Sequence, residues 1–161
     1  MSLGYYGIGI IGCKSKLNIG TLWRSAYAFG ASYIYTIAPR FERAIHRRQR
    51  SDTVDARRHL PYFVYETPEL FFATRPYHVP IIAVELSPEA APLETYIHPK
   101  QAVYLLGAED KGIPEYVLER CNSIIQIHSS YCLNVATAGS IVMYDRQQKQ
   151  GARGGEQAQW T

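Results

Sequence analysis

Glu109 and Asn134 are two polar side chains placed where a ligand could meet them. Glu109 lies between Gly107 and Gly112, which permit tight backbone turns, after the apolar run 101–107 that is expected to be a strand. In parallel sheets the carboxyl ends of strands are where ligands bind. Asn134 stands at the mouth of an apolar segment, where either a helix N-cap or a ligand contact would sit. An exposed loop glutamate and a simple cap are the plainer interpretations of the two residues.

Asn18 and Arg24 belong to a predicted amphipathic helix over residues 16–32. Asn18 suits the N-cap and Gly30 the C-cap of this helix. Arg24 lies off the apolar stripe, so spacing alone describes it as a solvated arginine. The stripe follows helical periodicity and comprises Ile19, Leu22, Trp23, Ala26 and Gly30.

The stretch 129–146 predicts a buried C-terminal helix. It begins as a polar loop and then runs from Leu133 to Tyr144 without a charge. A helix that is apolar on every side is buried. The small residues at 138–140 would let a neighbouring segment approach closely.

The remaining segments predict an α/β fold with a parallel sheet. Strand 4–12, helix 16–32 and strand 33–38 make a β-α-β unit, which implies parallel strands and a right-handed crossover. Further strands are expected at 61–66, 79–86, 101–107 and 123–128, with a loop at 87–98. Short helices are expected to start at Pro68, capped by Thr67, and at Pro114, the latter running to about Arg120. The chain of 161 residues suits one domain over 1–146, followed by a polar, disordered tail over 147–161.

The glycines of the first strand offer a second interpretation. Gly7, Gly9 and Gly12 match the GxGxxG dinucleotide fingerprint. That motif follows a strand, opens a helix and has an acidic residue about 20 positions on. Here the glycines lie inside the apolar run, and the first acid after Gly12 is Glu42. Close packing of neighbouring backbone on the strand is the favoured interpretation, and a nicotinamide dehydrogenase the alternative.

The basic residues of the chain are unevenly distributed. Net charge is only +3, but seven arginines lie between positions 40 and 58. Such a cluster favours contact with a nucleic-acid backbone over a merely solvated surface. The candidate RNA-binding residues are Arg43, Arg47, Arg48, Arg50, Arg57 and Arg58.

Neither a disulfide nor a metal site is expected from the cysteines. Cys13, Cys121 and Cys132 have neither CxxC nor zinc spacing, which indicates reduced thiols. No apolar run reaches the length of a membrane span, and no signal peptide is evident, so a cytoplasmic protein is expected.

Three blocks of the sequence carry a resemblance to a known family. In chain order they are NIGTLWRSAYAFG, LLGAEDKGIP and IIQIHSSYCLNVATAGSIVMYD. Together they resemble the three motifs of the SpoU (TrmH-type) branch of the SPOUT RNA methyltransferases, over about residues 5–146. Any one block would be a weak match, but three in order with apt spacing are specific. The chain resembles a minimal single-domain member of this branch.

The resemblance implies a fold, a cofactor and a reaction. The fold is a parallel-sheet SPOUT domain with a C-terminal deep trefoil knot, and the enzymes are homodimers whose sites are completed across the interface. S-adenosylmethionine is the cofactor, and a ribose 2′-hydroxyl in RNA receives the methyl group, with tRNA favoured over rRNA. Catalytic positions carried over by the motifs are Asn18, Arg24, Glu109 and Asn134. The implied cofactor wall comprises Val84, Glu85, Leu86, Gly107, Ala108, Glu109, Ile127, Cys132, Leu133 and Asn134.

Arg24 is the group that this family uses as a base or to polarise the hydroxyl. An arginine side chain stays protonated at accessible pH. We therefore favour a role in which Arg24 orients the hydroxyl and an adjacent phosphate and stabilises developing alkoxide charge. Glu109 and Asn134 would anchor the loops and Arg24.

Two positions depart from the family pattern. Cys132 stands where the third motif usually has serine, and His128 where proline is common. Ser129 or Ser130 could supply the missing hydroxyl. A non-catalytic RNA-binding protein that retains the knotted fold is the alternative left open by Cys132.

Overall fold

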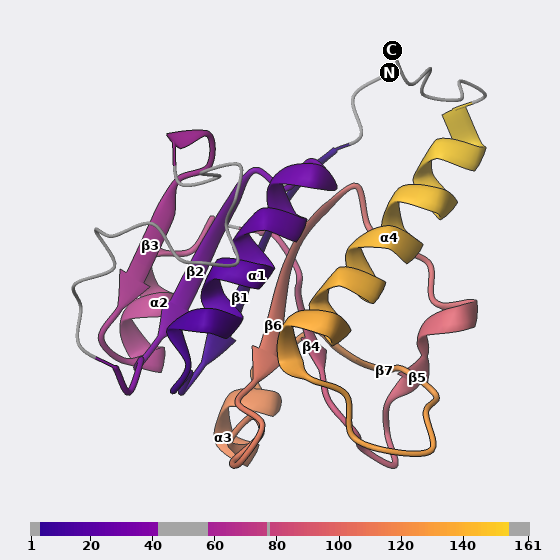
Figure 1. The fold of residues 1–161 in the computed structure, drawn as a ribbon. Helices are drawn as coiled ribbons and strands as arrows, with labels where there is room; N and C mark the ends of the chain where they lie inside the picture. The colour runs from indigo at the N-terminus through magenta and orange to yellow at the C-terminus, as the bar shows by residue number, and fades with distance from the viewer. Residues whose placement is uncertain (1–3, 42–57, 77, 155–161) are drawn as a thin grey trace.

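The computed structural model describes residues 4–41, 58–76 and 78–154. All strand pairings in it are parallel, and seven strands form one sheet in the order β3-β2-β1-β6-β4-β7-β5. This confirms the parallel α/β fold, and the strands end at the lower edge of the molecule in Figure 1. The strands are β1 (Tyr5–Ile11), β2 (Tyr33–Ile37), β3 (Tyr62–Tyr65), β4 (Ile81–Val84), β5 (Ala91–Pro92), β6 (Gln101–Gly107) and β7 (Ser123–Gln126).

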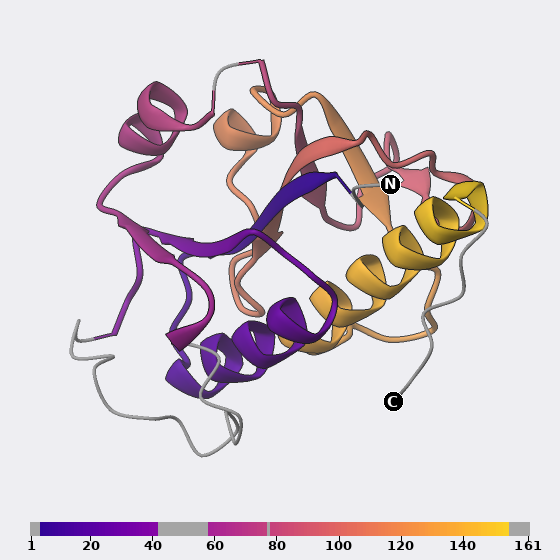
Figure 2. The same ribbon diagram turned by 90° about the horizontal axis from the view of Figure 1, so that it is seen from above.

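Helices cover both faces of the sheet. The long helices α1 (Lys16–Ala28) and α4 (Val135–Gly154) lie side by side on one face, and the short helices α2 (Pro68–Thr74) and α3 (Glu115–Leu118) lie on the other (Figure 2). Each face has its own apolar core. Leu22 of α1 and Met143 of α4 belong to one, and Phe71 of α2 and Val117 of α3 to the other. The segment predicted as a loop, 87–98, contains β5 and the 3-10 helix η2 (Leu93–Thr95).

The glycines of β1 make room for tyrosines of β2. Gly7 pairs with Tyr33 and Gly9 with Tyr35 in the β1–β2 register. A Cβ at Gly7 would lie 2.2 Å from the Tyr33 ring, and one at Gly9 would lie 2.4 Å from the Tyr35 carbonyl oxygen. The close-packing interpretation is therefore confirmed. Because Gly7 and Gly9 lie inside a strand and α1 begins only at Lys16, the dinucleotide fingerprint does not describe this segment.

Capping side chains set where the helices begin. Ser15 Oγ accepts a hydrogen bond from the Asn18 backbone N–H at 3.3 Å, so Ser15 caps α1 and the expectation that Asn18 does so is wrong. A cap three residues earlier leaves the Asn18 side chain available for other contacts. Thr67 caps α2 as predicted. Helix α3 is shorter than the predicted span to Arg120, ending at Leu118.

Helix α4 is buried on one side only within this chain. Val135, Ala136, Val142 and Met143 are buried, whereas Tyr144 is 53% exposed. The prediction of burial on every side is therefore wrong for the single chain. The small-residue face does pack closely against α1: a Cβ at Gly139 would lie 2.6 Å from Leu22 Cδ1, and Ser140 Oγ lies 2.8 Å from Ser25 Oγ.

The expected tail begins inside α4, because the helix continues from Gln147 to Gly154. Lys149 Nζ donates to the Leu93 carbonyl at 2.6 Å, and Gln150 Nε2 donates to the Pro99 carbonyl at 3.1 Å. These long polar side chains reach acceptors that a composition-based prediction cannot see. The rest of the expected tail, 155–161, lies outside the described residues.

Neither a membrane span nor a metal site is found among the helices and side chains of the described ranges. None of the helices there is both long and apolar enough to cross a bilayer. Among those residues, no group of three or more His, Cys, Asp or Glu side chains is placed to hold a metal ion.

Candidate active site

Asn134 joins three segments that are far apart in the chain. Its Nδ2 donates to Glu109 Oε1 at 2.7 Å and to Asn18 Oδ1 at 3.0 Å. Its Oδ1 accepts from the backbone N–H groups of Ala136, at 3.0 Å, and Thr137, at 3.2 Å. The oxygen must face the helix donors, so the amide nitrogen must face Glu109 and Asn18. Asn134 is thus both the N-cap of α4 and the centre of a polar cluster.

Sheet topology explains why these three side chains meet. Asn18 lies in the first turn of α1, after β1, Glu109 follows β6, and Asn134 follows β7. Parallel strands end at one edge of a sheet, so their following loops converge there. We call Asn18, Glu109 and Asn134 the polar cluster. Residue types predicted these positions, but only the sheet order brings them into contact.

Arg24 does not belong to the polar cluster in this chain. It lies six residues after Asn18 on α1, about 9 Å further along the helix axis. Its side chain is exposed and has no hydrogen-bond or ion-pair partner among the described residues. The expected anchoring of Arg24 by Glu109 and Asn134 is therefore not seen within a single chain.

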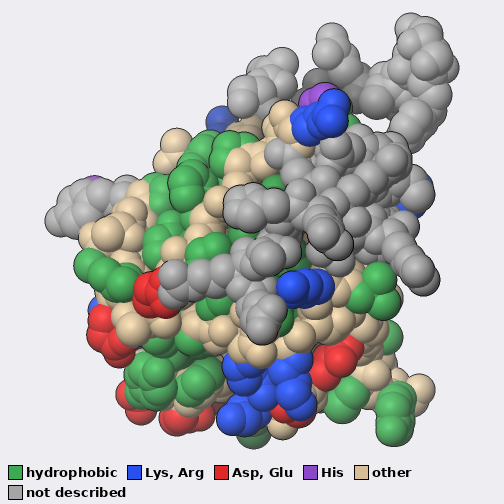
Figure 3. Space-filling model, turned by 60° about the vertical axis from the view of Figure 1, so that its left-hand side comes forward, with side chains coloured by type: hydrophobic (Ala, Val, Ile, Leu, Met, Phe, Trp, Pro, Cys, Tyr) green, Lys and Arg blue, Asp and Glu red, His purple; other side chains and the backbone are tan. Residues whose placement is uncertain are grey.

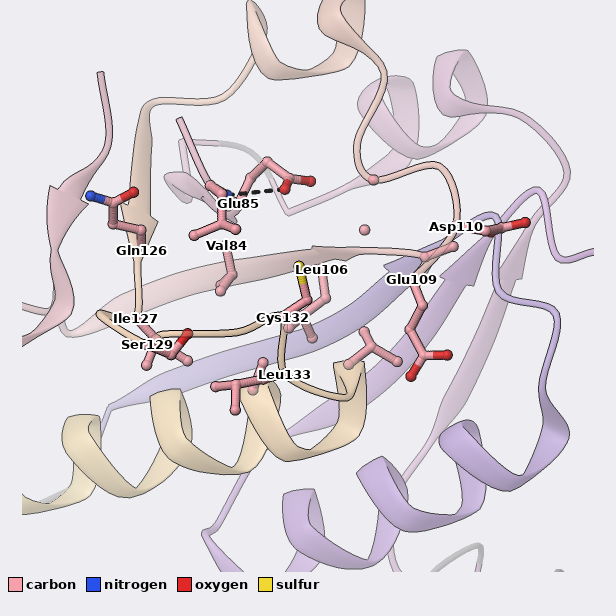
Figure 4. Close-up of a pocket in the computed structure, with 16 residues that line it drawn as sticks. Val84, Glu85, Leu106, Glu109, Asp110, Gln126, Ile127, Ser129, Cys132 and Leu133 are labelled. Carbon is pink, nitrogen blue, oxygen red and sulfur yellow. Dashed lines mark hydrogen bonds between the residues drawn. The ribbon is translucent and has the colours of Figure 1, made fainter. Parts of the chain in front are cut away.

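A cavity of about 220 Å³ opens beside the polar cluster. Three segments form its wall: the end of β4, the loop after β6 and the loop after β7. Figure 4 shows Val84 and Glu85 on one side of it, Cys132 and Leu133 on the other, and Glu109 extending toward the helices. Of the predicted cofactor-wall residues, Asn134 alone does not line this cavity. Those that do are Val84, Glu85, Leu86, Gly107, Ala108, Glu109, Ile127, Cys132 and Leu133.

Sequence reasoning missed part of the wall. Asp110 and Gly112 belong to the same glycine-flanked loop as Glu109, so that motif could have indicated them. Val135 and Ala138 are apolar residues of α4 that were assigned to the core, and nothing in their type distinguishes a cavity wall from a core. The other missed lining residues are Leu106 and Gln126; Ser129, which the sequence suggests as a source of the hydroxyl, also lines the cavity.

A smaller cavity of about 110 Å³ adjoins the first. The two share Ala108, Glu109, Asp110 and Val135. On its far side the smaller cavity is lined by Lys14, Ser15 and Asn18, at the start of α1, and also by Ile10 and Cys13. Glu109 therefore stands between two adjoining spaces.

Glu85 fixes the loop that carries Glu109. Its Oε2 accepts from the backbone N–H of Ile113 at 2.9 Å, and its Oε1 accepts from the N–H of Leu86 at 3.0 Å. Position 112 favours glycine, because the residue has a φ of +63° and a Cβ there would lie 2.8 Å from Glu85 Oε2. The predicted role of Gly112 in a tight turn is confirmed by its backbone.

The cysteines are unpaired, as expected. Cys132 is exposed and lines the main cavity in place of the family's serine. Ser129 lines the same cavity, and its hydroxyl donates to the Tyr131 carbonyl at 2.9 Å. A hydroxyl is therefore present in this wall despite the cysteine. Burial raises the pKa of the Cys13 thiol and raises that of Cys121 to about 11, which favours the protonated thiol at both positions.

Most of the candidate RNA-binding arginines cannot be placed. Arg43, Arg47, Arg48, Arg50 and Arg57 lie outside the described residues, whereas Arg58 is exposed just before β3. On the face shown in Figure 3, Lys and Arg side chains gather in the lower part of the molecule, with carboxylates beside them.

The comparison with protein families identifies the chain. The model of the SpoU rRNA Methylase family matches residues 8–144. The chain belongs to the SpoU rRNA methylase family, and the sequence-based recognition of this branch is confirmed. By sequence, no curated protein matches the chain significantly.

Solved structures of similar fold come from several such proteins. An AdoMet-bound rRNA methyltransferase from Sinorhizobium meliloti is 21% identical with a TM-score of 0.78, over 90% of this chain and 56% of that one. A structure described for 2-OH methylation of C/U34 on tRNA is 21% identical with a TM-score of 0.83, over 94% of this chain and 100% of that one. The TrmH/SpoU tRNA modifying enzyme of A. aeolicus is 20% identical with a TM-score of 0.80, over 92% and 77%. This chain therefore spans little more than half of the first protein and all of the second.

Proposed function

We propose that this protein transfers a methyl group from S-adenosylmethionine to a ribose 2′-hydroxyl in RNA. The observation that carries the proposal is the polar cluster, in which Asn134 bonds both Glu109 and Asn18 at the edge of a cavity. Family membership supplies the class of reaction. tRNA is the favoured substrate, because the similar structure described for tRNA methylation matches 94% of this chain over 100% of its own length.

The main cavity has the chemistry to hold S-adenosylmethionine. Glu85 and Glu109 provide carboxylates for the polar and positively charged parts of the cofactor. Apolar surface for its flat base comes from Val84, Leu86, Leu106, Ile127 and Leu133. When bound, S-adenosylmethionine supplies a methyl group on a sulfonium sulfur. The AdoMet-bound S. meliloti structure supports this choice of cofactor.

The residues of the chain then need to align and deprotonate a hydroxyl, since ribose oxygen is a poor nucleophile until its proton is drawn away. The smaller cavity at the start of α1 is the proposed place for the target ribose, because it adjoins the main cavity at Glu109. Asn134 holds Glu109 and Asn18 at the boundary. Arg24 would orient the hydroxyl and its phosphate and stabilise negative charge on the oxygen as its proton passes to solvent. The oxygen could then take the methyl group that leaves the sulfonium sulfur.

A homodimer is part of the proposal, because Arg24 has no contact with the polar cluster of its own chain. We assign Arg24 to a site completed by a second copy of the protein. Two exposed aromatic side chains support such an interface: Tyr131, before α4, is 86% exposed, and Tyr144, in the middle of α4, is 53% exposed. The family's C-terminal trefoil knot, a cytoplasmic location and RNA contacts by Arg43, Arg47, Arg48, Arg50, Arg57 and Arg58 belong to the same proposal.

The experiment that tests the function compares 2′-O-methylation across total RNA from cells with and without the gene. One or more tRNA positions should lose the modification and regain it when purified protein and S-adenosylmethionine are added. Calorimetry with S-adenosylmethionine separates an enzyme from a protein that only binds RNA, because the latter would give no cofactor binding. Methylation of a base in place of ribose, or unchanged maps with no cofactor binding, would contradict the proposal.

A further inference from the structure

Asp110 is held by two cations from two other loops. Arg40 Nη1 donates to Asp110 Oδ2 at 2.9 Å, and Arg40 Nη2 donates to Oδ1, so the guanidinium and the carboxylate form a bidentate pair. Lys14 Nζ lies 3.0 Å from Asp110 Oδ2. Hydrogen bonds from Arg40 and Lys14 hold the pKa of the Asp110 carboxyl well below its usual range. The carboxylate is therefore ionised throughout the physiological pH range.

Arg40 is itself fixed to the end of β1. Its Nε donates to the Gly12 carbonyl at 2.7 Å, and its backbone N–H donates to the Cys13 carbonyl at 2.8 Å. Every nitrogen of its guanidinium therefore donates a hydrogen bond, a geometry that lysine cannot reproduce. By sequence Arg40 belongs to the basic stretch attributed to RNA binding, but in the structure its hydrogen bonds connect the segments after β1, β2 and β6.

Asp110 and Lys14 are each one residue away in the chain from a residue that positions the polar cluster. Asp110 follows Glu109, and Figure 4 shows their side chains pointing in different directions, with Glu109 extending toward the helices. Lys14 precedes Ser15, the cap of the helix that carries Asn18. Glu85 holds the far end of the same loop through Ile113. The loop is therefore held at Asp110 and at Ile113, and Glu109 directly precedes the first of these two positions.

We infer that Arg40 and Asp110 are positioning residues that set Glu109 against Asn18 and Asn134; this rests on the proposed function. Asp110 is 38% and Arg40 27% exposed at the side chain, so the pair lies near solvent. Ion pairs in that environment contribute little to global stability. A bidentate pair does fix the relative position of two backbones. Its removal therefore changes turnover more than stability.

The test compares Asp110→Asn and Arg40→Gln with Lys111→Gln. Lys111 is the next residue of the same loop, and its exposed side chain has no ion-pair partner within the described ranges. We expect kcat at saturating RNA and cofactor to fall about tenfold to a hundredfold in the first two variants, with melting temperatures close to wild type. Lys111→Gln should keep wild-type kcat. The kcat of Arg40→Lys should lie between those of wild type and Arg40→Gln, because lysine keeps the positive charge but cannot form the bidentate pair.

A double mutant shows whether the two residues act through each other. Asp110→Asn combined with Arg40→Gln should turn over no more slowly than the worse single variant, because the second change removes a contact already lost. Independent, multiplying losses in kcat would overturn the inference. So would a wild-type kcat in Asp110→Asn when wild-type protein is active.

Hydrogen exchange provides a readout that needs no activity. The Gly112 N–H donates to the Ala108 carbonyl at 2.7 Å and the Ile113 N–H to Glu85, so both report on the Glu109 loop. Their exchange should quicken about tenfold in Asp110→Asn and Arg40→Gln, by loss of local protection, and stay unchanged in Lys111→Gln. Unchanged exchange in all three variants overturns the inference. If wild-type protein transfers no methyl group, the proposed function fails and these exchange rates decide the inference alone.

Discussion

Asn134 Nδ2 donates to Asn18 Oδ1 at 3.0 Å, joining side chains that are 116 positions apart. The same nitrogen reaches Glu109, 25 positions away. One amide therefore fixes the mutual position of the first turn of α1, the loop after β6 and the start of α4. The amide oxygen is occupied by helix N–H groups, which leaves the nitrogen a single orientation.

Replacing Asn134 by aspartate separates its two roles. Asp keeps the oxygen that caps α4 and has nearly the same shape, but its second oxygen would face Glu109 Oε1 at the position now 2.7 Å away. Like charges at that distance repel. We expect methyl transfer to fall at least about a hundredfold and the α-helical circular dichroism to stay unchanged. Asn134→Ala, which also removes the cap, should lower stability by about 1 kcal/mol; Asn134→Asp with normal turnover would remove Asn134 from the active site.

Arg24→Ala should lower methyl transfer at least about a hundredfold, the usual scale for losing a group that stabilises developing negative charge. S-adenosylmethionine affinity by calorimetry should stay within about twofold, because Arg24 does not line the main cavity. Arg24→Lys keeps the charge and should retain part of the activity. Full activity of Arg24→Ala would leave the protein without its proposed hydroxyl-orienting residue.

Arg146 holds the second half of α4 and is expected to dominate its stability. The side chain is only 2% exposed, donates to the carbonyls of Pro99 and Lys100 at 2.6 and 2.7 Å, and lies 4.7 Å from the Tyr6 ring. Arg146→Met removes the donor to the Lys100 carbonyl and leaves the Pro99 carbonyl with Gln150 Nε2 alone. With the lost packing on the Tyr6 ring, we expect a cost of about 3 kcal/mol. Urea denaturation measures this loss.

Lys149→Met is the matched control for Arg146→Met. Lys149 lies one turn further along α4 and is 29% exposed at the side chain, with bonds to Asp145 and Leu93. Its removal should cost about 0.5 kcal/mol, because water replaces the lost partners. Equal losses from the two variants would contradict the assignment of Arg146 as the main anchor.

His98 should make stability depend on pH. Its ring is buried between Tyr104, 2.6 Å from Nδ1, and Asp145, 2.8 Å from Nε2, with Arg146 and Lys149 nearby. Burial lowers the pKa of His98 below its ordinary 6.5, although the hydrogen bond to Asp145 opposes this shift. The unfolded chain then binds the proton more readily than the folded one. Stability is therefore complete above about pH 6.5 and is lost as pH falls through the folded-state pKa.

Thermal melting between pH 8 and pH 5 measures this dependence. His98→Gln keeps hydrogen-bonding groups but does not titrate, so its melting temperature should change less over this range than that of wild type. Parallel curves for the two proteins would show that other groups account for the acid sensitivity.

Much of the fold could be predicted because local patterns survive in the final structure. Apolar runs became β1, β2 and β6 with nearly the predicted bounds, and Thr67 and Asn134 cap their helices as predicted. The cap of α1 was misplaced because Ser15 and Asn18 are both good capping residues, and sequence alone does not rank two such neighbours. The end of α4 was missed because its polar side chains bond to Leu93 and Pro99, which are distant in sequence.

The sequence by itself determined the residue types of the site: Asn18, Glu109 and Asn134 could be named from their motifs alone. Only the tertiary structure decided that Asn134 bonds the other two, that Arg24 stays apart from them, and that Arg40 pairs with Asp110. The physical reason is that hydrogen bonds and ion pairs act over a few ångströms, whereas the partners are tens to more than a hundred residues apart. Their distance in space is set by the order β2-β1-β6-β4-β7 in the sheet, and no local pattern encodes that order.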